Sequence, residues 1–179
     1  YAAYGSQWRA DYGPSDGLGA IDSGSAILSR WPLGEAERVA LPLRTDQDGL
    51  TRYFYLRRNY LRAQLSLPGR DPLWVVNIHT DAYGKDGTKR AQIDLFHEEL
   101  VRLGADGSRV IGGGDLNAIP PGSTETGDFP DSVCEDVEFQ TDDYAEEADW
   151  LDALYADFTS AITLEEYAAD NAVHYTHTV

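Results

Sequence analysis

The 179-residue sequence contains no methionine and only one cysteine, Cys134. A single cysteine cannot form a disulfide bond within the chain, so cysteine usage does not indicate a redox compartment. No apolar run approaches the ~18 residues that a membrane-spanning helix requires, and no basic start followed by an apolar stretch marks a signal peptide near Tyr1. Because Tyr1 cannot be an initiator residue, we expect the chain to be processed or to belong to a longer protein.

Basic residues are absent from the last part of the sequence. Residues 1–109 hold all 14 Lys and Arg together with 14 Asp and Glu, whereas residues 110–179 hold 17 acidic residues and no basic one. The formal net charge of −17 therefore arises in the second segment. Such a surface repels phosphate backbones, which argues against sequence-independent affinity for nucleic acid. A solvated face is the simplest interpretation of the acidic run over residues 125–157.

The pattern of apolar residues predicts a mixed α/β domain. Frequent glycines over residues 1–23 predict a loop, and residues 25–31 predict a short strand that ends before Pro32. One long strand is expected over residues 53–67 because apolar and polar side chains alternate there. We expect one face of this strand to carry Leu61, Ala63 and Leu65, and the opposite face to carry Arg58, Arg62 and Gln64.

A strand, a helix and a second strand are expected next. Residues 73–78 form a nearly continuous apolar run, which is typical of a strand buried on both faces. Thr88 is expected to cap a helix that ends at Gly104, because apolar side chains recur between them at spacings of three and four. A second apolar strand then begins at Arg109 and leads into the sequence G-G-G-D-L-N at residues 112–117.

The order of these elements brings two polar residues together. Parallel strands joined by a helical crossover end at the same edge of a sheet. His79 ends the first strand and Asp115 the second, so we expect both at the edge where open α/β sheets bind ligands. Further along, helices are expected over residues 142–154 and 158–167, and a strand over residues 173–179.

Candidate catalytic residues are His79, Asp115 and Asn117. The sequence contains no Walker phosphate loop, no G-x-G-x-x-G fingerprint and no H-E-x-x-H zinc motif. Taken singly, the histidine can simply cap a strand end, and G-G-G-D-x-N can simply form a turn. Together, a carboxylate that orients water, an amide that holds it and an imidazole that donates to an anionic oxygen suit phosphate-ester hydrolysis. Arg58 is a candidate phosphate contact, with a solvated surface arginine as the alternative.

Three segments, in order, resemble the endonuclease/exonuclease/phosphatase superfamily, which includes pancreatic deoxyribonuclease and bacterial sphingomyelinases. They are G-S-A-I-L-S-R-W-P-L at residues 24–33, N-I-H-T followed by K-R-A-Q within residues 77–92, and G-G-G-D-L-N at residues 112–117. The resemblance implies a four-layer αββα sandwich and attack of water on phosphorus that depends on a divalent metal. It also implies a single domain over residues 1–179, truncated at both ends.

The resemblance further implies a role for each candidate residue. His79 would bond a phosphate oxygen, Asp115 would orient and activate water, and Asn117 would hold water or phosphate beside it. Arg58 lies about where deoxyribonuclease-like members place a phosphate-contacting arginine. The cofactor would be Mg²⁺, or else Mn²⁺ or Ca²⁺. The main glutamate ligand of the family would precede Tyr1 and a second catalytic histidine would follow the last residue, so the metal ligands in this chain are unknown.

Three classes of function follow from these observations. The first is a hydrolase of phosphate mono- or diesters, and the acidic charge favours a small phosphoester or a phospholipid headgroup over duplex DNA. The second is a catalytically incomplete sandwich that acts as a binding module. The third is an acidic calcium-binding domain. The sequence assigns no oligomeric state, and the resemblance to relatives that act outside the cytoplasm favours an extracytoplasmic location.

Overall fold

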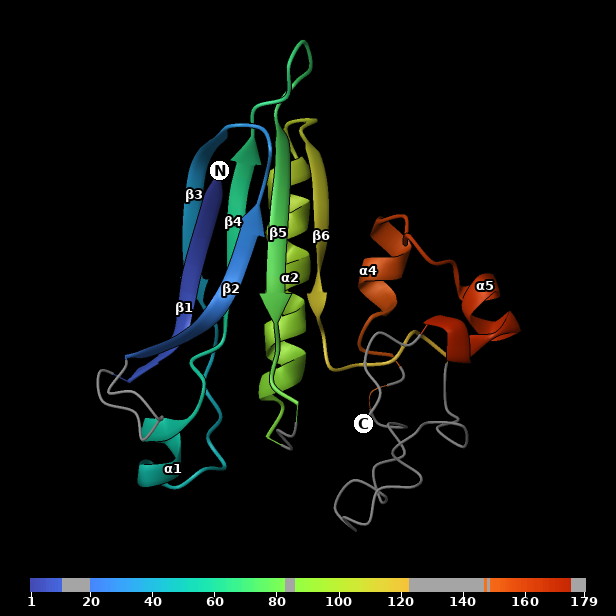
Figure 1. Ribbon diagram of the computed structural model, residues 1–179. Coiled ribbons are helices and arrows are strands. Elements are labelled where there is room, and N and C mark those ends of the chain that lie inside the picture. Colours follow the sequence, from blue (N-terminus) through green and yellow to red (C-terminus); the bar gives the residue numbers. More distant parts are fainter. Residues whose placement is uncertain (11–19, 83–85, 123–146, 148, 175–179) are drawn as a thin grey trace. The chain divides into compact units, whose positions relative to one another are not determined.

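The computed structural model describes residues 1–10, 20–82, 86–122, 147 and 149–174. The chain divides into two compact units, residues 1–117 and residues 118–179. The first unit contains all the strands of the described part (Figure 1). None of the helices described here is both long enough and apolar enough to cross a membrane.

The first unit is built around two sheets. Strands β1 and β2 pair antiparallel in one sheet, and the other sheet has the strand order β3-β4-β5-β6. Within the larger sheet, β5 and β6 run parallel and the other neighbours run antiparallel. The six strands are β1 (Ala2–Ala10), β2 (Ile21–Leu28), β3 (Leu33–Ala40), β4 (Asn59–Leu65), β5 (Leu73–His79) and β6 (Arg109–Asp115).

The two sheets face each other across an apolar core. Ile27 of β2 packs there with Leu61 and Ala63 of β4, all of them buried. Helix α2 (Thr88–Gly104) lies on the other side of the larger sheet (Figure 1). Its buried apolar residues are those expected from the spacing in the sequence, Ile93, Phe96, Leu100 and Leu103. The α/β fold class is therefore confirmed, and the first unit supplies a helix layer and both sheet layers of the αββα sandwich.

The loop expected over residues 1–23 is wrong, because Ala2–Ala10 form β1 and β2 begins at Ile21. The inward positions of β1 include Gly5 and Gln7, which weaken the apolar alternation that would indicate a strand. Gly5 serves close packing rather than a turn, because a Cβ there would lie 3.2 Å from Oδ1 of Asn59. Residues 11–19 of the expected loop lie outside the described part of the chain.

The single strand expected over residues 53–67 is also wrong in its first part. Helix α1 (Gly49–Phe54) occupies its beginning, and the Asp48 side chain caps that helix by accepting from the backbone N–H groups of its first turn. The strand itself begins at Asn59, after Arg58. Within β4 the expected faces are confirmed, since the three apolar residues Leu61, Ala63 and Leu65 are buried.

The expected strand, helix and strand over residues 73–115 are confirmed, with one local correction. Thr88 is the first helical residue rather than the cap, and the N-cap is Gly87 with a φ angle of 80°. Asp86 fulfils the capping function, because its Oδ1 accepts from the Thr88 N–H at 3.0 Å. Strand β3, which the sequence did not predict, is mostly solvent-exposed and therefore lacks a clear apolar face.

The second unit contains short helices. Helix α4 (Asp152–Asp157) begins later than expected, and residues 142–146 and 148 lie outside the described part. Helix α5 (Leu164–Ala169) begins with a capping box in which Thr163 and Glu166 bond reciprocally. Asn171–His174 form the 3-10 helix η3, which corrects the start of the strand expected over residues 173–179; the remainder is outside the described residues.

Gly114→Ala is expected to lower the free energy of unfolding by at least about 3 kcal/mol, whereas Gly113→Ala changes it by less than about 1 kcal/mol. A Cβ at Gly114 would lie 1.9 Å from the Ile78 carbonyl oxygen, at a φ angle of 137° that disfavours a side chain. A Cβ at Gly113 would meet no described atom within 4 Å. Urea unfolding followed by circular dichroism checks both variants, and equal losses of stability would contradict the close approach of β5 and β6.

Candidate functional site

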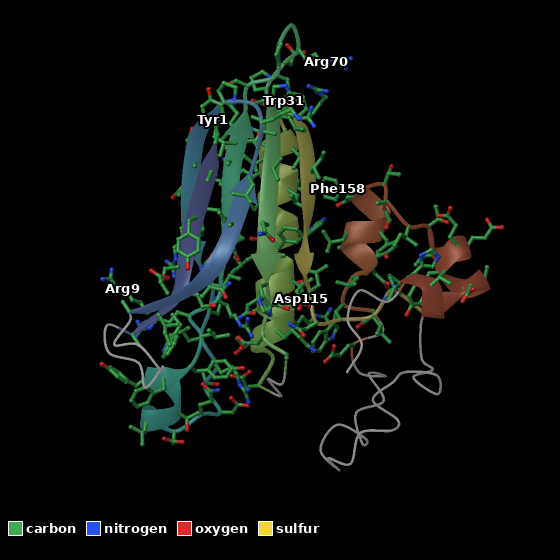
Figure 2. The ribbon with its side chains drawn as sticks, in the orientation of Figure 1. Tyr1, Arg9, Trp31, Arg70, Asp115 and Phe158 are labelled. Atoms are coloured by element: carbon green, nitrogen blue, oxygen red, sulfur yellow. The ribbon has the colours of Figure 1, made fainter. Side chains whose placement is uncertain are left out.

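The parallel pairing of β5 and β6 places His79 directly beside Asp115. The two residues are register partners at the last position of each strand. The His79 Nε2 atom lies 3.7 Å from Oδ2 of Asp115, and the side chains are 39% and 54% exposed. Figure 2 shows Asp115 where β6 ends, at the same edge as the end of β5. The expected meeting of these two residues at one edge of the sheet is thus present in the structure.

Asn117 lies in a tight turn directly after β6. Its φ angle is 47°, the left-handed conformation that asparagine tolerates better than most residues. The Asn117 backbone N–H donates to Oδ1 of Asp115 at 3.1 Å, and its side-chain Nδ2 donates to the Thr80 carbonyl at 3.1 Å. The Thr80 N–H in turn donates to the Asp115 carbonyl at 3.0 Å. The turn therefore ties the loop after β5 to the loop after β6.

Arg58 is buried, in contrast to the exposed position that the alternation of the sequence predicted. Its side chain is 5% exposed because the residue precedes β4 instead of belonging to an outward strand face. The Nε atom lies 3.8 Å from Oδ1 of Asp81, within ion-pair range but beyond hydrogen-bond range. Among the described residues, Nε and Nη1 of Arg58 and Oδ1 of Asp81 have no hydrogen-bond partner. A buried guanidinium with unmet donors can bind an anionic oxygen.

The environment of His79 favours its neutral form. Burial lowers the pKa of the imidazole, and the positive charge of Arg58 lowers it further. The carboxylates of Asp115 and Asp81 act in the opposite direction, but the pKa remains below its ordinary value. At neutral pH the ring therefore has one N–H donor and one acceptor nitrogen. Such a ring can donate to a phosphoryl oxygen without needing a proton from solvent.

Asp81 is a residue of this site that the interpretation of the sequence missed. It lies two residues after His79 and is 1% exposed. Gln92 of α2 holds it on two sides, since Nε2 donates to Oδ2 of Asp81 at 2.6 Å and Oε1 accepts from its backbone N–H at 2.8 Å. The available signal was an acidic residue directly after a predicted buried strand. Its partner Arg58 comes from a distant segment, which only the fold reveals.

The described residues do not complete a site for a divalent cation. Among them, no group of three or more His, Cys, Asp or Glu side chains is arranged to hold a metal ion. Asp115 offers one exposed carboxylate at the edge of the sheet, whereas Mg²⁺ and Ca²⁺ are bound by six or more oxygen atoms, with water among them. Asp81 is buried, and one of its oxygens already accepts from Gln92. Any bound ion would need further ligands beyond these.

The chain matches a protein-family model over most of its length. The model described as "Endonuclease/Exonuclease/phosphatase family" matches residues 2–132, which include every residue of the site described above. No curated protein matches the chain.

Solved structures with similar folds are longer than this chain. An endonuclease/exonuclease/phosphatase from Beutenbergia cavernae is 22% identical, with a TM-score of 0.45 over 65% of this chain and 29% of that one. ANGEL2, a 2′,3′-cyclic phosphatase, is 19% identical, with a TM-score of 0.47 over 69% and 33%. The beta toxin of Staphylococcus aureus is 17% identical, with a TM-score of 0.47 over 75% and 40%. The chain thus spans less than half the length of each of these structures.

The His79 imidazole is expected to titrate below its ordinary pKa of about 6.5, and Arg58→Met is expected to raise that pKa. The variant removes a cation that disfavours protonation of the ring. Arg57→Met, at the exposed neighbouring position, serves as the matched control and should leave the titration unchanged. Nitrogen-15 NMR of the imidazole resonances, followed as a function of pH, measures the pKa of His79 in the unaltered protein and in both variants. A titration that is the same in Arg58→Met as in the unaltered protein would contradict the electrostatic coupling.

Proposed function

The chain belongs to the endonuclease/exonuclease/phosphatase family, and from that premise we propose that it carries catalytic residues of a metal-dependent phosphoester hydrolase. The observation that carries the proposal is the His79–Asp115 pair at the open edge of the sheet, with 3.7 Å between Nε2 and Oδ2. A carboxylate and a neutral imidazole side by side can act on a water molecule and on a phosphoryl oxygen of one bound ester.

Asp115 is the proposed general base. Its Oδ1 accepts from the Asn117 N–H, which fixes the carboxylate and leaves Oδ2 on the side of His79. The side chain is 54% exposed, so water can reach this oxygen. A base in this position can orient the water and accept its proton as the bond to phosphorus forms. Proton transfer to a positioned base contributes ~10²- to 10⁴-fold to the rate.

His79, Asn117 and Arg58 are proposed to bind the phosphoester. The neutral His79 ring donates to a phosphoryl oxygen, and Asn117 holds water or phosphate beside Asp115. The Nδ2 atom of Asn117 donates one of its two N–H groups to the Thr80 carbonyl, so the second N–H can donate to a phosphoryl oxygen and the amide oxygen can accept from water. Arg58 has unmet N–H donors and lies close enough to His79 for its charge to lower the pKa of the ring. We propose that these donors bind an oxygen of the ester.

The proposed cofactor is Mg²⁺, with Mn²⁺ or Ca²⁺ as alternatives. When bound, such an ion neutralises charge that develops on the phosphoryl oxygens. Asp115 is the carboxylate of this edge that could contribute to its coordination, and the other ligands would come from residues outside those described. The family to which the chain belongs, and not a ligand cluster in the structure, supports the cofactor.

The proposed substrate is a small phosphoester or a phospholipid headgroup rather than duplex DNA. The formal net charge of −17 supports this preference, because it repels a long polyanion more strongly than it repels a single phosphoester. Duplex binding would require several basic side chains in line along a surface. The last 70 residues, 110–179, contain none.

Asp115→Asn in the full-length protein is expected to lower kcat by ~10²- to 10⁴-fold, because the amide cannot accept the proton of the attacking water. Release of p-nitrophenol from a chromogenic phosphodiester measures the rate. Asp94→Asn is the matched control, since it makes the same substitution at an exposed position of α2. Retention of more than about a tenth of the wild-type rate in Asp115→Asn would exclude the proposed base.

Removal of divalent cations is expected to abolish hydrolysis of the same phosphodiester by the full-length protein. Dialysis against EDTA, followed by titration with Mg²⁺, Mn²⁺ or Ca²⁺ in parallel samples, should restore the rate with at least one of the three ions. If the ion and this carboxylate act in the same reaction, Asp115→Asn should also lower the rate that the added ion restores. Full activity after exhaustive chelation would exclude metal dependence.

A further inference from the structure

Lys89, in the first turn of α2, is completely buried. Its exposed fraction is 0%, and it is among the largest fully buried side chains of the described residues. The ammonium group donates to the Asn117 carbonyl at 2.8 Å and to the Ala82 carbonyl at 3.3 Å. A buried ammonium is costly unless hydrogen bonds compensate for its lost hydration. The two acceptors belong to the loops that follow β6 and β5, so Lys89 joins the two segments of the candidate site.

Gln92 extends this arrangement by one helical turn. It lies three residues after Lys89, on the same side of the helix, and is also 0% exposed. Its Nε2 atom donates to the Pro42 carbonyl at 2.8 Å in addition to its two hydrogen bonds with Asp81. Lys89 and Gln92 are the first and last residues of the K-R-A-Q segment. The segment therefore fixes three loops at the edge that holds His79 and Asp115.

The contact between Lys89 and Asn117 acts on a left-handed turn of the backbone. Asn117 has a φ angle of 47°, a conformation that few residues other than glycine and asparagine adopt readily. A hydrogen bond from a charged donor is shorter and stronger than one from a neutral donor. The carbonyl that Lys89 holds belongs to Asn117, whose N–H, on the preceding peptide plane, donates to Oδ1 of Asp115. Holding Asn117 in place therefore restrains the donor that orients the Asp115 carboxylate.

We propose that Lys89 is a positioning residue for Asp115, acting through the carbonyl of Asn117. The ammonium holds the turn after β6, the turn holds Oδ1 of Asp115, and Oδ2 is thereby kept beside His79. This inference rests on the proposed function, because it concerns the orientation of the proposed base. Lys89 itself is 0% exposed, so its effect on the reaction passes through the residues that it contacts.

Lys89→Met in the full-length protein tests the proposal. Methionine keeps most of the side-chain volume but cannot donate to the two carbonyls. We expect kcat for the chromogenic phosphodiester to fall 10- to 100-fold, which is roughly the effect of removing a group that orients a ligating or catalytic side chain. We expect KM to change by less than about threefold. Leu103→Ala is the control for stability, because it removes a buried side chain at the other end of α2. It should lower Tm while leaving kcat within about twofold of wild type.

A double-mutant cycle separates positioning from general destabilisation. If Lys89 acts through Asp115, Lys89→Met should lower the residual rate of Asp115→Asn by less than about twofold. Independent losses that multiply would overturn the proposal, as would a wild-type kcat in folded Lys89→Met. If circular dichroism shows that Lys89→Met does not fold, the same cycle is carried out with Lys89→Gln, whose shorter, neutral side chain weakens both hydrogen bonds, and the same two outcomes overturn the proposal. Full activity of Asp115→Asn alone would instead overturn the proposed function, so the two failures are distinguishable.

Discussion

The parallel pairing of β5 with β6 is the constraint on which the candidate site depends. Its register sets His79 opposite Asp115, and a shift by one residue would turn one of the two side chains to the other face of the sheet. The close approach at Gly114 restricts β6 to this register, because a side chain at this position would collide with the backbone carbonyl of Ile78. The positions of the catalytic candidates thus follow from backbone packing before any side-chain chemistry is considered.

Behind the exposed pair lies a layer of buried polar groups. Lys89 and Gln92 bond to backbone and carboxylate acceptors with good geometry, while Arg58 and Asp81 face each other at 3.8 Å with unmet hydrogen-bonding capacity. Buried polar groups are costly unless they are hydrogen-bonded. The satisfied members therefore stiffen the edge, whereas the unmet N–H donors of Arg58 are the groups to which the proposed phosphoester would bind. This division separates the residues that shape the site from the residue proposed to contact a ligand there.

The sequence was sufficient to predict the part of the fold that carries the candidate site. The apolar runs of β5 and β6 and the helical spacing between them predicted the crossover, and the crossover predicted the meeting of His79 and Asp115. Strands β1 and β3 were missed because glycine, glutamine and exposed residues hide their alternation. The burial of Arg58 could not be predicted, because it results from contacts between segments that are distant in the sequence.

The strand order has a consequence for how the site could be enlarged. Strand β6 ends the order β3-β4-β5-β6, so among the described residues it pairs on one side only (Figure 1). No strand of the described part pairs with its other side, and Ile111 of β6 is 56% exposed. A strand added there would continue the sheet and end or begin next to Asp115. The strand that bears the proposed base is thus also a template with which a further strand could pair beside the candidate site.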